Sequence, residues 1–107
     1  MSKLGCVCGH VIVDQADQIP YKASFITDVD LFDFYEAVDN TINTSLNHKE
    51  TFSEQIIDRF IRYSADMYEC TQCGRLWIGI GNNQFKAFLP ESGKYQAILN
   101  IQHDRFK

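Results

Sequence analysis

Hydrophobic residues recur at helical spacing in two stretches in the middle of the chain. In the first stretch, Thr27 or Asp28 can cap a helix that runs to about residue 40 and has a broad apolar side. That side consists of Leu31, Phe32, Phe34, Tyr35, Val38 and Ile42. In the second stretch, a capping box over residues 51–54 begins a helix that continues until the chain approaches Asp66. Its apolar residues are Phe52, Ile56, Ile57, Phe60 and Ile61.

The segments on either side of these helices have the composition and alternation of β-strands. Residues 10–13 and 21–26 each predict a short strand. Residues 75–80 and 84–89 predict a β-hairpin, because the glycine and asparagine turn between them can take positive φ. Residues 95–101 fit either a further strand or a short helix. The expected fold class is therefore α+β.

Length and composition predict one domain spanning residues 1–107. A hydrophobic content of 45% is enough for a core. No apolar stretch approaches the roughly 20 residues that a membrane-spanning helix needs, and the first residues lack the basic and then apolar run of a signal peptide. We expect a cytoplasmic protein without membrane contact. Because cytosolic thiols are kept reduced, its cysteines favour metal or redox chemistry over disulfides.

The formal net charge of −4 conceals an uneven distribution of charge along the chain. Residues 1–58 contain three basic and ten acidic side chains, whereas residues 59–107 contain seven basic and four acidic ones. This distribution argues against a surface that follows nucleic-acid phosphates over the whole domain, and it favours a protein or a basic ligand as partner. The candidate partner-binding residues are Asp28, Asp30, Asp33, Glu36 and Asp39. The ordinary alternative for such acids is a solvated helix face.

The four cysteines occur in two close pairs, which is the pattern of a metal site. Cys70-Thr-Gln-Cys73-Gly74 has the form of a zinc knuckle, in which the glycine lets backbone N–H groups point at the sulfurs. Cys6-Val-Cys8-Gly9 is one residue shorter than the usual knuckle, so the backbone must turn there, and Gly5 and Gly9 permit a turn. The predicted ligands of one structural Zn²⁺ are Cys6, Cys8, Cys70 and Cys73.

Three alternatives for the cysteines follow from the same residues. His10 can replace Cys6 as a ligand, since the spacing from Cys8 is also suitable. Cys70 and Cys73 resemble a thioredoxin-like redox pair, but that chemistry needs the pair at a helix N-terminus after a strand. Four thiolates also bind iron or an iron–sulfur cluster.

The sequence contains no recognisable arrangement of a nucleophile, a base and an orienting group. A site with four thiolate ligands is coordinatively closed and leaves no position for a catalytic water. We therefore expect a binding protein and not an enzyme.

The knuckle from Cys70 to Gly74 and the strand after it resemble the second half of zinc-ribbon and rubredoxin-type domains, where a knuckle lies at the tip of a hairpin. The resemblance implies metal binding without implying an activity. The Cys-x-Cys-Gly start, followed by Asp14 and Pro20 to Ala23, is similar to small bacterial proteins that open in this way. In size and acidity the chain is also similar to immunity proteins, which neutralise bacterial toxins that often carry cationic domains.

These observations predict a zinc-ribbon-like antiparallel β core with two helices inserted between the two Cys pairs and packed on the sheet. Residues 1–26 would carry the first Cys pair and strands, residues 27–66 the helical insertion, and residues 67–107 the knuckle and hairpin. The expected function is a zinc-binding protein-interaction module, in its concrete form an immunity protein. The alternative is a nucleic-acid-binding or transcription accessory protein that uses one hairpin face with Arg75, Trp77 and Lys86.

Overall fold

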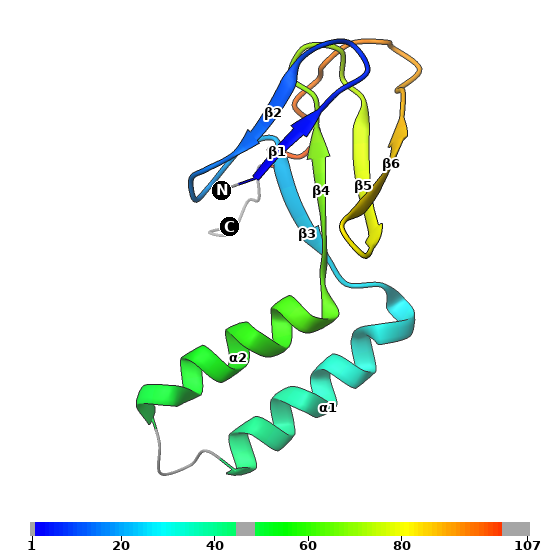
Figure 1. Ribbon diagram of the computed structural model, residues 1–107. Helices are drawn as coiled ribbons and strands as arrows, with labels where there is room; N and C mark the ends of the chain where they lie inside the picture. The colour runs from blue at the N-terminus through cyan, green and yellow to red at the C-terminus, as the bar shows by residue number, and fades with distance from the viewer. Residues whose placement is uncertain (1, 45–48, 102–107) are drawn as a thin grey trace, which may run out of the picture. The chain divides into compact units, whose positions relative to one another are not determined.

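The computed structural model describes residues 2–44 and 49–101, which form two compact units (Figure 1). The sheet unit consists of the described residues up to 24 and from 66 onward, and the helical unit consists of those between 25 and 65. Within the described residues there are two helices and six strands, and the strands form two antiparallel sheets. The predicted α+β class is therefore confirmed.

The first sheet is an antiparallel hairpin at the start of the chain. It contains β1 (Ser2–Gly5) and β2 (Val11–Asp14), and Lys3 lies opposite Val13 in its register. The predicted strand at residues 10–13 corresponds to β2, whereas β1 was not predicted. Ile12 is almost fully buried, so this hairpin contributes to the core of the sheet unit.

The second sheet has the strand order β3-β4-β5-β6. Its strands are β3 (Lys22–Phe25), β4 (Ala65–Glu69), β5 (Leu76–Gly81) and β6 (Gln84–Phe88). The predicted hairpin is confirmed, and Asn82 and Asn83 have φ values of 54° and 58°, as the tight turn of a twisted hairpin requires. The sequence pattern extended the second helix toward Asp66, but this helix ends at Tyr63 and β4 begins at Ala65. The helix was therefore predicted slightly too long at its C-terminal end.

Residues 95–101 form neither of the two elements expected for them. The alternation of half-buried and exposed side chains from Tyr95 to Leu99 is present, but the segment is irregular and Ile101 is 63% exposed. The backbone N–H of Gln96 donates to the buried Glu69 carboxylate, 3.3 Å away, instead of joining a strand ladder. The segment is therefore held by a side chain and by packing.

The helical unit contains α1 (Asp28–Thr44) and α2 (Lys49–Tyr63). α1 starts at the predicted position, but its capping bonds differ from the predicted ones. Thr27 Oγ1 donates to the Asp30 carboxylate, and the Asp30 N–H donates to the Thr27 backbone carbonyl, both at 3.0 Å. α1 extends beyond the predicted end, and α2 begins two residues before the predicted capping box. The two helices meet through aromatic rings, since the Phe34 centroid lies 6.1 Å from Phe60 and 6.2 Å from Tyr63.

The apolar side predicted for α1 is wrong in part. Phe34 packs against α2, but Phe32 is 74% exposed and Tyr35 is 51% exposed. The apolar residues of α1 cover a wider part of its surface than α2 can bury. The packed side of α1 also includes a polar residue, Thr41, which is only 3% exposed. α1 therefore presents aromatic side chains among its acids.

The core of the sheet unit is organised around Tyr68 and the carboxylate of Asp14. Tyr68 is 6% exposed and donates from its hydroxyl to Asp14 Oδ2 at 2.6 Å. Lys22 Nζ lies 2.7 Å from the same oxygen. The hydrogen bond from Lys22, and to a lesser extent the one from Tyr68, holds the pKa of Asp14 below its usual value. β2, β3 and β4 are thereby joined by one ionised side chain.

We expect Asp14→Asn to lower the free energy of unfolding by about 2 kcal/mol, because two hydrogen bonds lose their charged acceptor. A carboxylate with a lowered folded pKa stabilises the fold above its unfolded pKa of about 4, and this stabilisation disappears as the pH falls through the folded pKa. Urea unfolding at pH 7 measures the effect. Asp17→Asn, an exposed acid of the following loop, is the control, and equal losses in both variants would refute the role of Asp14.

Candidate metal centre

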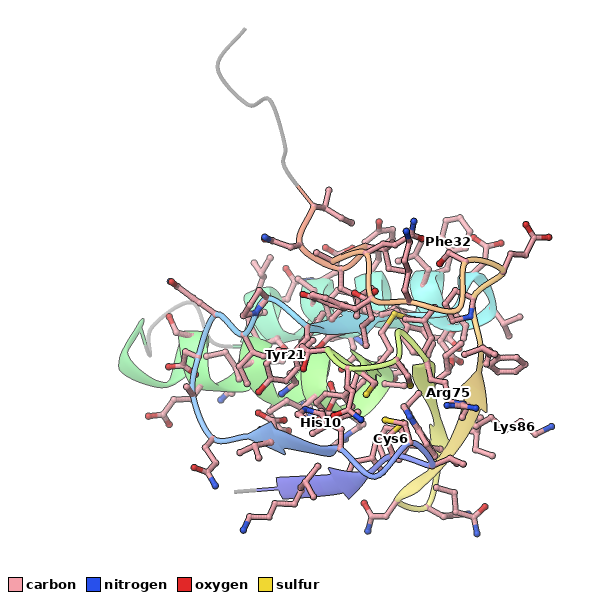
Figure 2. All side chains as sticks on the ribbon, turned by 90° about the horizontal axis from the view of Figure 1, so that it is seen from above. Cys6, His10, Tyr21, Phe32, Arg75 and Lys86 are labelled. Atoms are coloured by element: carbon pink, nitrogen blue, oxygen red, sulfur yellow. The ribbon has the colours of Figure 1, made fainter. Side chains whose placement is uncertain are left out.

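The four cysteines converge from two turns of the sheet unit. Cys6 and Cys8 lie in the turn between β1 and β2, and Cys70 and Cys73 lie in the turn between β4 and β5. All four sulfur atoms lie within 4.8 Å of one another. The prediction that these four cysteines come together is therefore confirmed. In Figure 2, Cys6 lies between the labelled side chains of His10 and Arg75.

The spacing of the sulfurs fits one tetrahedral ion. The Cys6 and Cys73 sulfurs are 3.6 Å apart, as are those of Cys8 and Cys70. A zinc ion with Zn–S bonds of about 2.3 Å places its ligands about 3.8 Å apart. A disulfide needs a separation of about 2 Å, and all four residues are free thiols. Among the described residues, no histidine or carboxylate belongs to this cluster.

The first turn has the tight geometry that its short spacing requires. The Cys6 N–H donates to the His10 carbonyl at 2.8 Å, and the Gly9 N–H donates to the Cys6 carbonyl at 3.0 Å. Gly9 has a φ of 97°, which a residue with a side chain rarely adopts. Gly5 ends β1 without a positive φ, so only Gly9 serves the turn as expected.

The second turn has the hydrogen bonds of a metal knuckle. The Cys70 N–H donates to the Arg75 carbonyl and the Gly74 N–H donates to the Cys70 carbonyl, both at 2.8 Å. Gly74 has a φ of 83°, as the sequence motif predicted. The backbone N–H groups of Cys73 and Gln72 favour the ionised form of the Cys70 sulfur. The turn thus directs N–H donors at the Cys70 sulfur.

Burial and nearby hydrogen-bond donors shift the pKa values of Cys6, Cys70 and Cys73 in different directions. Burial raises the pKa of Cys70 to about 12. Burial also opposes ionisation of Cys6, but the backbone N–H of Cys8 and neighbouring donors outweigh it and lower the pKa of Cys6 to about 6. In Cys73 burial is outweighed in the same way by the backbone and side chain of Arg75, so its pKa is lowered. Burial opposes ionisation of these three thiols, and a cation among the sulfurs would favour it.

Two side chains around the sulfurs complete the fit to a metal. Arg75 donates from Nη1 to the Cys73 sulfur at 3.3 Å, which would offset part of the negative charge of a site with four thiolates. Trp77 Nε1 is buried and has no hydrogen-bond partner within described residues, yet this N–H contributes to the lowered pKa of Cys6. An indole N–H near a sulfur is suited to donate to a metal-bound thiolate. Sequence reasoning assigned neither residue to the metal centre.

The geometry does not favour the two other uses of these residues. His10 Nε2 lies 3.2 Å from Thr71 Oγ1 and is outside the cysteine cluster, so His10 does not replace Cys6. Cys70 and Cys73 lie on a turn between two strands and not at a helix N-terminus. The structural context of a thioredoxin-like pair is therefore absent from this turn.

The five acidic residues proposed to bind a partner all lie at or along α1 in the helical unit. Four are exposed, namely Asp28, Asp33, Glu36 and Asp39, and Asp30 is half-buried. Asp30 accepts the hydrogen bond from Thr27, so it belongs to the helix cap as well. The acidic set therefore remains a candidate surface and has no part in the metal centre.

The hairpin face suggested for nucleic acid is wrong. Trp77 lies opposite Ala87 in the β5–β6 register, whereas Lys86 lies opposite Ile78. Because adjacent residues of a strand point to opposite sides, Trp77 and Lys86 face different sides of the sheet. Trp77 also packs against the core cluster of the sheet unit, which leaves no shared stacking platform.

Comparisons with known proteins place the chain in a family without assigning it an activity. In the described part of the chain, no helix is long and apolar enough to cross a membrane. Neither the curated proteins nor the solved structures contain a match to the chain. Residues 2–92 match the family model described as "Domain of unknown function (DUF8617)", and since this match covers most of the chain, the protein belongs to that family.

Proposed function

We propose that this protein is a small zinc-stabilised interaction module that binds a basic protein through α1. The observation that carries the metal part of the proposal is the cluster of four free thiols, all within 4.8 Å of one another. Zinc fits four thiolates in a tetrahedron, and reduced thiols of this kind belong in a reducing compartment such as the cytoplasm. Iron uses the same ligands and is the alternative ion.

The role proposed for the ion is structural. Four protein ligands leave zinc no open position for water or substrate, so the centre supports binding and not hydrolysis. The ion would join the β1–β2 turn to the β4–β5 turn, which 61 residues separate between Cys8 and Cys70. Closing so long a loop costs chain entropy, and metal binding would offset that cost.

The proposed partner surface is the exposed side of α1, on which aromatic and acidic residues alternate. Val29 is 87% exposed and Phe32 is 74% exposed. Glu36 follows Phe32 by one helical turn, and Asp28 precedes it by one, so acids flank the aromatic ring. Phe32 and Tyr35 also contact each other edge to face, with centroids 6.2 Å apart.

Phe32 is an exposed aromatic side chain flanked by acids, and such a surface suits a positively charged partner. The aromatic ring supplies buried contact area, and the acids accelerate association with a basic surface and disfavour acidic partners. A toxin domain with a basic surface is the concrete partner that this chemistry favours. The protein would then act as an immunity-type inhibitor.

A photo-crosslinking residue at position 32 tests this surface directly. We expect it to capture a basic protein in cells, and we expect Glu36→Lys with Asp39→Lys to weaken binding to the captured protein more than tenfold, because charge complementarity is lost. The salt dependence of that binding should be steep.

The matched control is the same crosslinker at Leu89, which is also exposed and lies after β6 in the sheet unit. Capture of the same protein from both positions, or binding that ignores the two charge reversals, would contradict the proposed surface. Binding of generic DNA or RNA at low salt would instead support the nucleic-acid alternative.

A further inference from the structure

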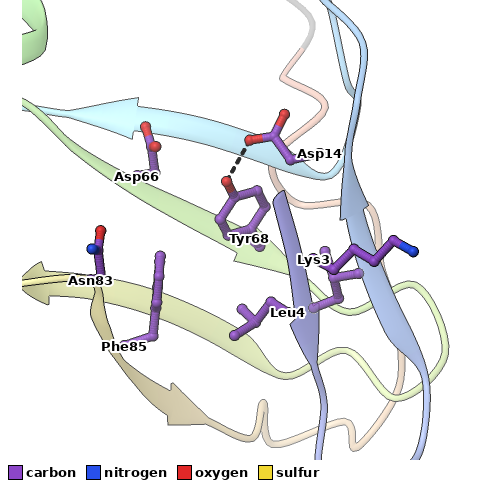
Figure 3. Close-up of a pocket in the computed structure, with 8 residues that line it drawn as sticks. Lys3, Leu4, Asp14, Asp66, Tyr68, Asn83 and Phe85 are labelled. Carbon is purple, nitrogen blue, oxygen red and sulfur yellow. Dashed lines mark hydrogen bonds between the residues drawn. The ribbon is translucent and has the colours of Figure 1, made fainter. Parts of the chain in front are cut away.

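A pocket of about 430 Å³ in the sheet unit is separate from the metal centre (Figure 3). Residues from β1, β2, β4 and the β5–β6 hairpin surround it. They include Leu4, Asp14, Asp66, Tyr68, Asn83 and Phe85. The volume lies within the range of about 300–1,000 Å³ that small-ligand sites have.

Two carboxylates at one side of this pocket retain free acceptor capacity. Asp14 uses Oδ2 for both Lys22 and Tyr68, and Asp66 uses Oδ1 to accept from Ser24 Oγ at 3.0 Å. The second oxygen of each carboxylate has no hydrogen bond within residues 2–44 and 49–101. Each can therefore accept from a donor group of a ligand.

The opposite side of the pocket is apolar and aromatic. Figure 3 shows Phe85 and Leu4 away from the two carboxylates, with the Tyr68 ring between these groups. The Tyr68 and Phe85 ring centroids are 5.8 Å apart. Such walls suit an alkyl stem or the flat face of a delocalised cation.

The chain itself provides an example of a cation bound by this set of groups. Lys22 Nζ lies 2.7 Å from Asp14 Oδ2 and 5.9 Å from the centroid of the Tyr68 ring. Lys3 is the only basic residue that lines the described pocket, and Figure 3 shows its ammonium group directed away from Asp66 and Tyr68. The pocket is therefore open to a further cation beside the two carboxylates.

We propose that this pocket binds a guanidinium group on an alkyl stem, as in the side chain of arginine. A guanidinium is planar, carries five N–H donors, pairs with carboxylate oxygens and stacks on aromatic rings. Its stem would lie along Leu4 and Phe85 while its donors reach Asp14 and Asp66. Both a free guanidinium compound and an arginine of a polypeptide offer this chemistry. The site does not depend on the partner surface proposed for α1.

The test is an NMR titration of the metal-loaded chain, residues 1–107, with arginine amide. We expect saturable shifts of the backbone amides of Tyr68, Asn83 and Phe85. Citrulline amide, which has nearly the same shape but no charge, should cause none. A short Gly/Ser peptide with one central arginine separates the sources: tighter binding than arginine amide identifies a polypeptide, and equal or weaker binding identifies a small molecule.

Asp66→Asn should weaken arginine amide binding at least about tenfold, because one charged acceptor becomes neutral. This variant retains an oxygen that can accept from Ser24, so its fold and metal content should be unchanged. Glu91→Gln removes one negative charge from an exposed residue of the sheet unit that does not line the pocket, and it should leave the affinity unaltered. The proposal is overturned by the absence of saturable shifts with arginine amide, by equal shifts with citrulline amide, or by equal affinities of wild type and Asp66→Asn. Loss of partner binding in α1 variants would leave this result unaffected.

Discussion

Replacing Cys70 by Ser is expected to remove bound metal and to unfold the sheet unit at ordinary temperature. Cys70 is fully buried and lies 3.6 Å from the Cys8 sulfur, so a serine hydroxyl would leave a buried polar atom and a three-ligand site. Structural zinc contributes on the order of 10 kcal/mol in small domains, which is comparable with the whole stability of a domain. Metal content and thermal unfolding of the purified variant measure the loss.

The matched control for Cys70→Ser is Val7→Ser, between the two cysteines of the other turn. Val7 is 74% exposed, so this change should alter stability by no more than about 0.5 kcal/mol. Retention of one metal ion and of the wild-type melting temperature by Cys70→Ser would show that the centre does not support the fold.

The second large effect is expected for Gly74→Ala, with a loss of more than about 3 kcal/mol from steric overlap added to a positive-φ penalty. Gly74 has a φ of 83°, and a Cβ atom there would collide with the Lys94 carbonyl group and lie 2.9 Å from the Tyr95 nitrogen. The knuckle and the irregular segment after β6 would have to separate. Urea unfolding at fixed metal concentration measures the change.

Gly93→Ala isolates the conformational part of that loss. Gly93 also has a positive φ, 67°, but a Cβ there would meet nothing within 4 Å. Its expected cost is about 1 kcal/mol, from backbone strain alone. Equal destabilisation by the two substitutions would mean that the contact between Gly74 and the Lys94 backbone contributes nothing.

Local patterns were sufficient to predict the helices, the hairpin turn and the cysteine cluster. The start of α1 follows from Thr27, and the turn at Asn82 and Asn83 follows from residues that tolerate positive φ. The four cysteines could be grouped because thiols in two close pairs have few other uses in a reducing compartment. Each helix, the turn and each cysteine pair can be recognised from residues that are neighbours in sequence.

Features that depend on strand pairing were not predictable in the same way. β1 and β4 are short and contain polar residues, so they lack a clear alternation until a partner strand is known. The opposite orientation of Trp77 and Lys86 follows only from the β5–β6 register. The pocket combines residues as distant in sequence as Asp14 and Asp66, which no spacing rule connects.

The exposure of Phe32 shows a limit of helical periodicity as well. An apolar residue in an amphipathic pattern is expected on the packed side, yet α2 contacts Phe34 and leaves Phe32 exposed. Periodicity indicates that a helix has an apolar side, but it does not say how much of that side a neighbour buries. In α1 the apolar side is wider than the part that α2 covers.

Native mass spectrometry of the protein purified without chelator, combined with alkylation of free thiols, tests the four-thiolate centre most directly. The geometry predicts one metal ion per chain, zinc by mass, and four thiols protected from alkylation until the protein is denatured or the metal is chelated. A metal-free chain whose Cys70 and Cys73 are oxidised or freely alkylated in the native state would contradict a structural metal centre.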